Sequence, residues 1–237
     1  MKIGVWASKG LSINLLQKES DMKSVGIVLS GCGVFDGSEI HESVLSLLSV
    51  TQSGAQVYFF APDEPQRTVI NHLSGEEKSE KRNMLEESAR ISRGEIRSLA
   101  DADASQLDAL IVPGGFGAAK NLCDFAVKGA DCEIDKYFLL LTREMLSQGK
   151  PMGFMCIAPV MIPKIVNSSV QLTIGDDSDI AAAIAKMGGV HVSCTVDNIV
   201  VDETHKIVTT PAYMLAENIA QAQIGIDKLV KKVLEMA

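Results

Sequence analysis

A cysteine occupies the point where a predicted strand passes directly into a predicted helix. Residues 152–155 form a short apolar run, Cys156 follows at once, and residues 157–166 have the apolar spacing of a helix. A side chain on such a tight turn is displayed above the sheet, and the N–H of Ile157 can serve an oxyanion. The helix N-terminus favours the thiolate. The pattern predicts a cysteine nucleophile; the alternative is an inert thiol buried at a strand end.

A second strand end is rich in glycine. Residues 107–112 are predicted to form a strand that stops at the sequence Pro-Gly-Gly-Phe-Gly, residues 113–117. Successive glycine N–H groups can point into one concavity and bind an anion or a developing oxyanion. The glycine spacing fits neither a Walker loop nor a dinucleotide fingerprint, which excludes nucleotide binding. A simple tight turn is the alternative.

Acidic residues and a histidine gather after the first predicted strand. Asp36, followed three positions later by Glu39, has the pattern of a capped helix start. Glu42 then lies about one turn into the helix and can reach across the strand ends, whereas His41 projects about 100° away from it. The two side chains are therefore not expected to face one sulfur together. For each of these four residues, the alternative is that the side chain caps the helix or is simply solvated.

The remaining cysteines suggest neither disulfides nor a metal site. Their number is odd, they are widely spread, and they lack zinc-ligand spacing, which indicates reduced thiols and no bound metal. Cys32 lies in a Gly-Cys-Gly loop near the same edge as Cys156 and is a secondary candidate, better suited to a redox-sensitive position than to a nucleophile. The five cysteines are Cys32, Cys123, Cys132, Cys156 and Cys194.

The elements that must position these residues alternate between strand and helix. Apolar strands alternating with amphipathic helices predict an α/β fold with a mostly parallel sheet covered on both faces. Ligands bind such sheets at the carboxyl ends of the strands. Strands are expected over 25–29, 55–61, 107–112, 152–155, 170–174 and 191–196, with a hairpin of 199–201 and 206–209. Helices are expected over 40–51, 79–91, 134–146, 157–166, 177–187 and 214–234.

Residues 23–237 are expected to form a single domain. The polar, charged stretch around 62–94 interrupts the alternation and is interpreted as an insertion. Residues 1–22 are interpreted as a flexible extension, because their apolar patch is too short for a secretory signal.

Composition narrows the class of partner. The chain has 237 residues and a net charge of −8, which argues against nucleic acid as the main partner. No apolar run approaches the ~18 residues needed to cross a bilayer, so no membrane partner is expected. We predict a cytoplasmic protein that forms a homo-oligomer, with a dimer as the commonest symmetric arrangement.

Four segments of the chain resemble the PfpI-like superfamily, which is related to class I glutamine amidotransferase domains, and within it the ElbB-like proteins. The resemblance extends from Lys23 to the C-terminus, and the segments are 25–42, 109–121, 153–159 and 208–214. It implies a flavodoxin-like three-layer sandwich and a nucleophile elbow at Cys156. It also implies a carboxylic acid from Glu42 and an oxyanion hole around Gly114, Gly115 and Ile157.

The resemblance further implies cofactor-independent glyoxalase activity, which converts glyoxal to glycolate, and a poorly defined link to isoprenoid synthesis. We expect Cys156 to add to a small dicarbonyl, the Gly114 and Gly115 amides to hold its oxygen, and Glu42 to shuttle the proton.

The chain departs from the superfamily at the position after the nucleophile. Many members have histidine there, where this chain has Ile157, and residues 209–213 contain no histidine either. Glutaminase and protease chemistry both require a general base, so they are disfavoured. A non-catalytic stress-response protein in which Cys156 senses oxidants is the main alternative.

Overall fold

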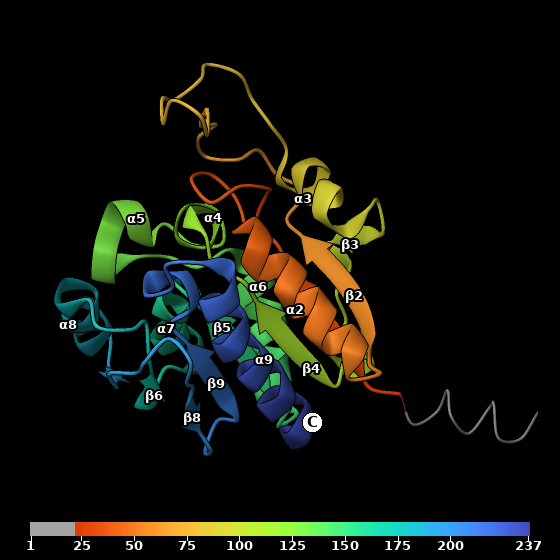
Figure 1. The fold of residues 1–237 in the computed structure, drawn as a ribbon, viewed down its shortest axis with the longest axis vertical. Helices are drawn as coiled ribbons and strands as arrows, with labels where there is room; N and C mark the ends of the chain where they lie inside the picture. The colour runs from red at the N-terminus through yellow and green to blue at the C-terminus, as the bar shows by residue number, and fades with distance from the viewer. Residues whose placement is uncertain (1–21) are drawn as a thin grey trace, which may run out of the picture.

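The computed structural model describes residues 22–237, and a mostly parallel sheet lies at their centre (Figure 1). Within these residues the main sheet has seven strands in the order β3-β2-β1-β4-β5-β9-β8, and all neighbours are parallel except β8 and β9. The predicted α/β class is confirmed. The strands are β1 (Ser24–Val28), β2 (Gln56–Ala61), β3 (Ile96–Ser98), β4 (Ala109–Val112), β5 (Met152–Met155), β8 (Val200–Asp202) and β9 (Ile207–Thr210). The predicted extension 1–22 lies, apart from Met22, outside the described residues.

Helices cover both faces of the sheet and give three layers. Alternate residues of a strand point to opposite faces, so Ile27 and Ile111 pack in one apolar cluster while Val28 and Leu110 pack in the other. Helices α2 and α9 lie side by side over the first face. The α-helices are α2 (Ile40–Gln52), α3 (Met84–Ser92), α4 (Phe116–Lys120), α5 (Phe125–Lys128), α6 (Lys136–Ser147), α7 (Ile162–Val166), α8 (Ser178–Lys186) and α9 (Ile219–Met236).

Several expected boundaries were wrong for local reasons. The strand expected over 191–196 is β7 (Gly189–His191), which pairs with β6 (Val170–Leu172) in a separate two-stranded sheet. The helix expected over 157–166 begins as a 3-10 turn over Ala158–Met161 before α7. Pro163, the seventh residue of the expected helix, lacks the N–H that a regular α-helix starting at residue 157 would need at that position.

N-cap residues determine where three other helices start. Asn83 caps α3, because its side chain accepts hydrogen bonds from the N–H groups of Leu85 and Glu86, so this helix starts later than expected. Asn218 caps α9 in the same way through Gln221. Helix α2 is capped by Glu39, not by Asp36 as expected.

The charged stretch before α3 contains no regular element. Residues 62–83 form an irregular excursion that extends away from the sheet (Figure 1). Strand β3, which follows α3 at the edge of the sheet, was missed because only three residues form it. Residues of this excursion form hydrogen bonds with the loop that follows β1.

Leu229 joins α9 to the centre of the sheet, and its truncation tests this packing. A Cβ at Gly153 in β5 would lie 2.6 Å from Leu229 Cδ2, so the leucine occupies the space that the glycine leaves. We expect Leu229→Ala to lower the free energy of unfolding by about 2–5 kcal/mol, because it leaves a cavity. Urea denaturation measures this loss. Ile224→Ala on the exposed side of the same helix should change stability by less than about 0.5 kcal/mol, and equal losses in both variants would contradict this packing.

Candidate active site

Cys156 lies on a strained turn directly after β5. Its φ of 58° is in the left-handed region, which costs a residue other than glycine about 1–2 kcal/mol. The turn is fixed from behind, since the Cys156 N–H donates to the Thr210 carbonyl oxygen at 3.1 Å, at the end of β9. The side chain is 7% exposed. The structure therefore places the sulfur at the carboxyl edge of the sheet, on the sharp turn that the sequence predicted.

Glu42 meets this sulfur from helix α2. The side chain is fully buried, and the Cys156 thiol donates a hydrogen bond to its carboxylate. Two backbone groups hold the carboxylate in place: Gly114 N–H donates to Oε2 at 2.8 Å, and Tyr213 N–H donates to Oε1 at 3.2 Å. Glu42 is therefore oriented by contacts on both of its oxygens.

Burial changes the protonation of both groups. Desolvation, assisted by the charge of Glu39, raises the pKa of Glu42 to about 7, although hydrogen bonds from Tyr213, Gly114 and Cys156 oppose the shift. Desolvation and the Glu42 carboxylate raise the pKa of the Cys156 thiol well above its ordinary value. The expectation of a lowered thiol pKa was wrong, because the field of one helix N-terminus is smaller than these two effects. The resting pair is a thiol hydrogen-bonded to a carboxyl group that ionises near neutral pH.

Two backbone amides remain directed at the sulfur. The N–H groups of Gly115 and Ile157 hydrogen-bond to Cys156 Sγ and favour negative charge there. Gly114 was expected to share this role, but its N–H is already engaged by Glu42. Gly114 instead provides space: a Cβ at this position would lie 2.5 Å from Cys156 Cβ and 2.8 Å from its Sγ.

The secondary candidates lie around this pair rather than against the sulfur. His41 is exposed, and its Nδ1 hydrogen-bonds to the Tyr213 hydroxyl at 2.7 Å. Sequence analysis did not single out Tyr213 or Thr210, although both lie in the segment 208–214 that carries the family resemblance. Cys32 is half-buried near Glu87 and Asp36, and burial together with these charges raises the pKa of its thiol.

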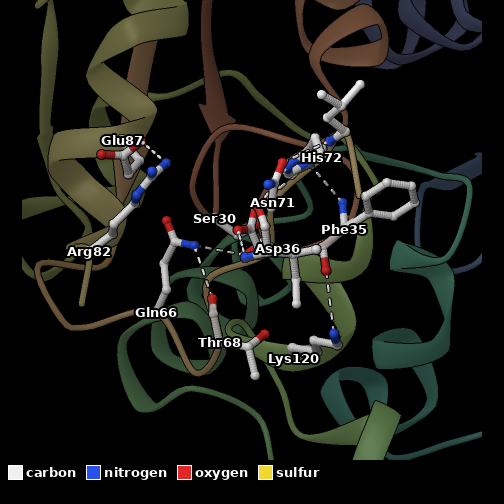
Figure 2. A network of polar contacts seen from close by, with 12 residues as sticks. Ser30, Phe35, Asp36, Gln66, Thr68, Asn71, His72, Arg82, Glu87 and Lys120 are labelled. Atoms are coloured by element: carbon white, nitrogen blue, oxygen red, sulfur yellow. Dashed lines mark hydrogen bonds and ion pairs between the residues drawn. The ribbon is translucent and has the colours of Figure 1, made fainter. Parts of the chain in front are cut away.

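Polar contacts anchor the loop after β1, which carries Cys32 and Asp36, to residues distant in the sequence (Figure 2). Asp36 is buried and accepts a hydrogen bond from Ile70 N–H at 2.7 Å. Gln66 donates to the Asp36 carbonyl, and Lys120 donates to the Phe35 carbonyl. The irregular segment 62–83 thus binds the loop beside the site, which explains why Asp36 does not cap α2.

No group of three or more His, Cys, Asp or Glu side chains in residues 22–237 is arranged to hold a metal ion. None of the helices in this range has the length and apolar character required to cross a membrane.

Two solved structures are similar to this chain to different degrees. An isoprenoid biosynthesis protein with an amidotransferase-like domain from Ehrlichia chaffeensis is 34% identical, with a TM-score of 0.85 over 90% of this chain and 99% of that one. Glyoxalase III from Candida albicans is 14% identical, with a TM-score of 0.59 over 91% and 97% of the two chains. The second likeness shows the fold alone.

No family model matches the chain. Two mammalian proteins are similar to it in sequence. The rat ES1 protein homolog and the human glutamine amidotransferase-like class 1 domain-containing protein 3 are each 45% identical over 222 residues. These matches cover 90% of this chain and 83% and 82% of the relatives. Both relatives are named as mitochondrial proteins, which contradicts the predicted cytoplasmic location. The sequence identity over nearly the whole chain shows that this protein belongs to the ES1 family of glutamine amidotransferase-like class 1 domain proteins.

Proposed function

We propose that the protein is a cofactor-independent glyoxalase that converts glyoxal or a similar small dicarbonyl to a hydroxy acid. The observation that carries this proposal is the proximity of the Cys156 sulfur to the buried Glu42 carboxyl group, since a Cβ at Gly114 would lie 2.8 Å from Sγ and 3.0 Å from Oε2. It joins a nucleophile to a proton acceptor whose pKa, raised by burial to about 7, matches the range in which general bases work best.

The first step is addition of the sulfur to an aldehyde. Glu42 accepts the thiol proton as Cys156 Sγ bonds to the carbonyl carbon, so a free thiolate need not persist in the buried site. The Gly115 and Ile157 amides, which face the sulfur at rest, can hold the oxygen on the newly bonded carbon. Glu42 then returns the proton to that oxygen and a hemithioacetal results.

The second step moves a proton between the two carbons. The Glu42 carboxylate removes the C–H proton of the hemithioacetal carbon, which gives an enediolate, and delivers that proton to the adjacent carbon. The hydroxyl proton on the sulfur-bearing carbon passes to the oxygen of the adjacent carbon, and the product of this step is a thioester of the hydroxy acid. Water then cleaves the carbon–sulfur bond, releasing glycolate and regenerating the thiol. Glyoxal and water are consumed, and no oxidant or reductant is required.

The likenesses support this reaction more than its alternatives. A glyoxalase III shares the fold, and a solved relative is described as an isoprenoid biosynthesis protein; we propose that same pathway link here. An oxidant-sensing role for Cys156 is less well supported, because a thiol with a raised pKa reacts slowly with peroxide. Glutaminase chemistry lacks support because the groups that interact with the Cys156 sulfur, among the described residues, include no histidine.

Removal of either member of the pair tests the proposal. Cys156→Ala is expected to abolish glyoxal consumption because the covalent intermediate cannot form, and Glu42→Gln to slow it by about 10²–10⁴-fold. Glycolate formation without glutathione is the measurement. Cys194→Ala, at a half-exposed thiol away from the pair, serves as the matched control. Unchanged turnover by folded Cys156→Ala protein would reject the mechanism.

The pH dependence of kcat/KM tests the direction of proton transfer. Glu42 must be ionised to accept the thiol proton, and burial raises its pKa to about 7. We therefore expect kcat/KM to be low at pH 5 and to rise through an apparent pKa near 7. A rate that falls over this range would indicate that Glu42 works in its protonated form, contrary to the proposal.

The same shift predicts a change of stability with pH. Because the pKa of Glu42 is raised from 4.5 to about 7 on folding, the folded protein holds its proton more tightly. The associated stability is fully present below pH 4.5 and is lost as pH rises through about 7. Its upper limit is about 3 kcal/mol. Urea denaturation should show wild type losing stability relative to Glu42→Gln between pH 4.5 and 7.5. Parallel curves for the two proteins would contradict the raised pKa.

A further inference from the structure

Two thiols outside the candidate active site are neighbours. Cys123 and Cys132 lie close enough for each thiol to shift the pKa of the other, and both are free and buried. Cys132 Sγ also lies 4.0 Å from Met187 Sδ, and Cys123 Sγ donates to the Ala118 carbonyl oxygen at 3.3 Å. Neither thiol has a role in the reaction proposed for Cys156.

Backbone pairing explains why the two sulfurs meet. Cys123 forms an isolated antiparallel bridge with Ile134, and the N–H of Asp124 donates to the Glu133 carbonyl oxygen at 3.2 Å. Side chains alternate between faces along such a pair. Cys132, two positions before Ile134, therefore shares a face with Cys123 as its diagonal neighbour, a position that regular strand geometry puts roughly 7–8 Å away.

The two thiols differ in their readiness to react. The hydrogen bond donated by Cys123, together with the nearby Lys164 charge, lowers the pKa of Cys132. The same contact and burial raise the pKa of Cys123. Of the two, Cys132 has the greater thiolate character, and the thiolate is the form that reacts with an oxidant. Cys123 is the neighbouring thiol that can attack the oxidised Cys132 and form a disulfide with it.

The two thiols are buried, but most of the short segment between them is exposed. Cys132 is 3% exposed and Cys123 4%, whereas Asp131 and Glu133, on either side of Cys132, are exposed. Between the two cysteines run helix α5, which contains no buried residue, and a 3-10 turn over Gly129–Asp131. A disulfide requires the sulfurs to approach to about 2.05 Å. This short, exposed segment can supply that approach without disturbing the main sheet.

We propose that Cys123 and Cys132 form a dithiol site that hydrogen peroxide converts to an intramolecular disulfide. The Cys132 thiolate attacks one peroxide oxygen, the O–O bond breaks, and after protonation of the leaving hydroxide a sulfenic acid and water are formed. The Cys123 sulfur then attacks the sulfenic sulfur, which forms the S–S bond and, with the Cys123 proton, releases a second water. Two thiols and one peroxide give one disulfide and two waters. The site goes beyond the proposed glyoxalase function and does not depend on it.

Mass spectrometry of the full-length protein tests the proposal. After peroxide treatment and alkylation, we expect a non-reducing digest to contain a peptide pair linked through Cys123 and Cys132, two hydrogens lighter than the reduced pair. Dithiothreitol should restore both alkylatable thiols. The wild-type measurement stands by itself even if a variant folds poorly, and its readout is independent of glyoxal turnover.

Variants assign the order of the two steps. Cys123→Ala should stop the reaction at a sulfenic acid on Cys132 that a dimedone reagent traps, and Cys132→Ala should abolish the disulfide. Cys194→Ala, at a half-exposed cysteine, should leave the disulfide unchanged. The proposal is overturned if Cys123 and Cys132 remain alkylatable after Cys32 has been oxidised, or if either forms its disulfide with a different cysteine.

Discussion

The hydrogen bond between a buried carboxyl group and a buried thiol is the interaction around which the candidate site is organised. Glu42 is withdrawn from water, and its two oxygens receive N–H groups from Gly114 and Tyr213. Without those donors, burial of an ionisable carboxyl would cost several kcal/mol. The amides offset part of that cost and hold the carboxylate beside Cys156. The site thus combines precise geometry with a carboxyl group that exchanges its proton near neutral pH.

The sheet makes this contact possible because it gathers four distant segments at one edge. Cys156 follows β5, Gly114 follows β4, Tyr213 follows β9, and Glu42 lies in the first turn of the helix that follows β1. Parallel strands place their carboxyl ends together. The glycine at 114 lets the backbone pass close to the sulfur, and the left-handed turn at Cys156 directs the thiol toward that edge.

Cys156 and Cys132 differ in the direction of their thiol pKa shift because their surroundings differ. Cys156 is buried against a carboxylate, which raises its pKa, whereas Cys132 accepts a hydrogen bond from another thiol and lies near a lysine, which lowers its pKa. We therefore propose reaction with oxidants at Cys132 rather than at Cys156. At the elbow, a neighbouring base can activate the sulfur at the moment of attack.

Sequence alone determined the alternation of strands and helices, and with it the α/β class and the strand end at which Cys156 lies, because apolar periodicity and glycine-rich turns are local signals. It also identified Glu42, through its position in the first turn of a helix and through family resemblance. Tertiary structure decided what depends on distant neighbours. Asp36 binds Ile70 instead of capping α2, the Gly114 amide binds Glu42, and Cys132 meets Cys123 across a bridge. The direction of the Cys156 pKa shift belongs to the same group, since burial and a carboxylate 114 positions away in the sequence outweigh the local helix end.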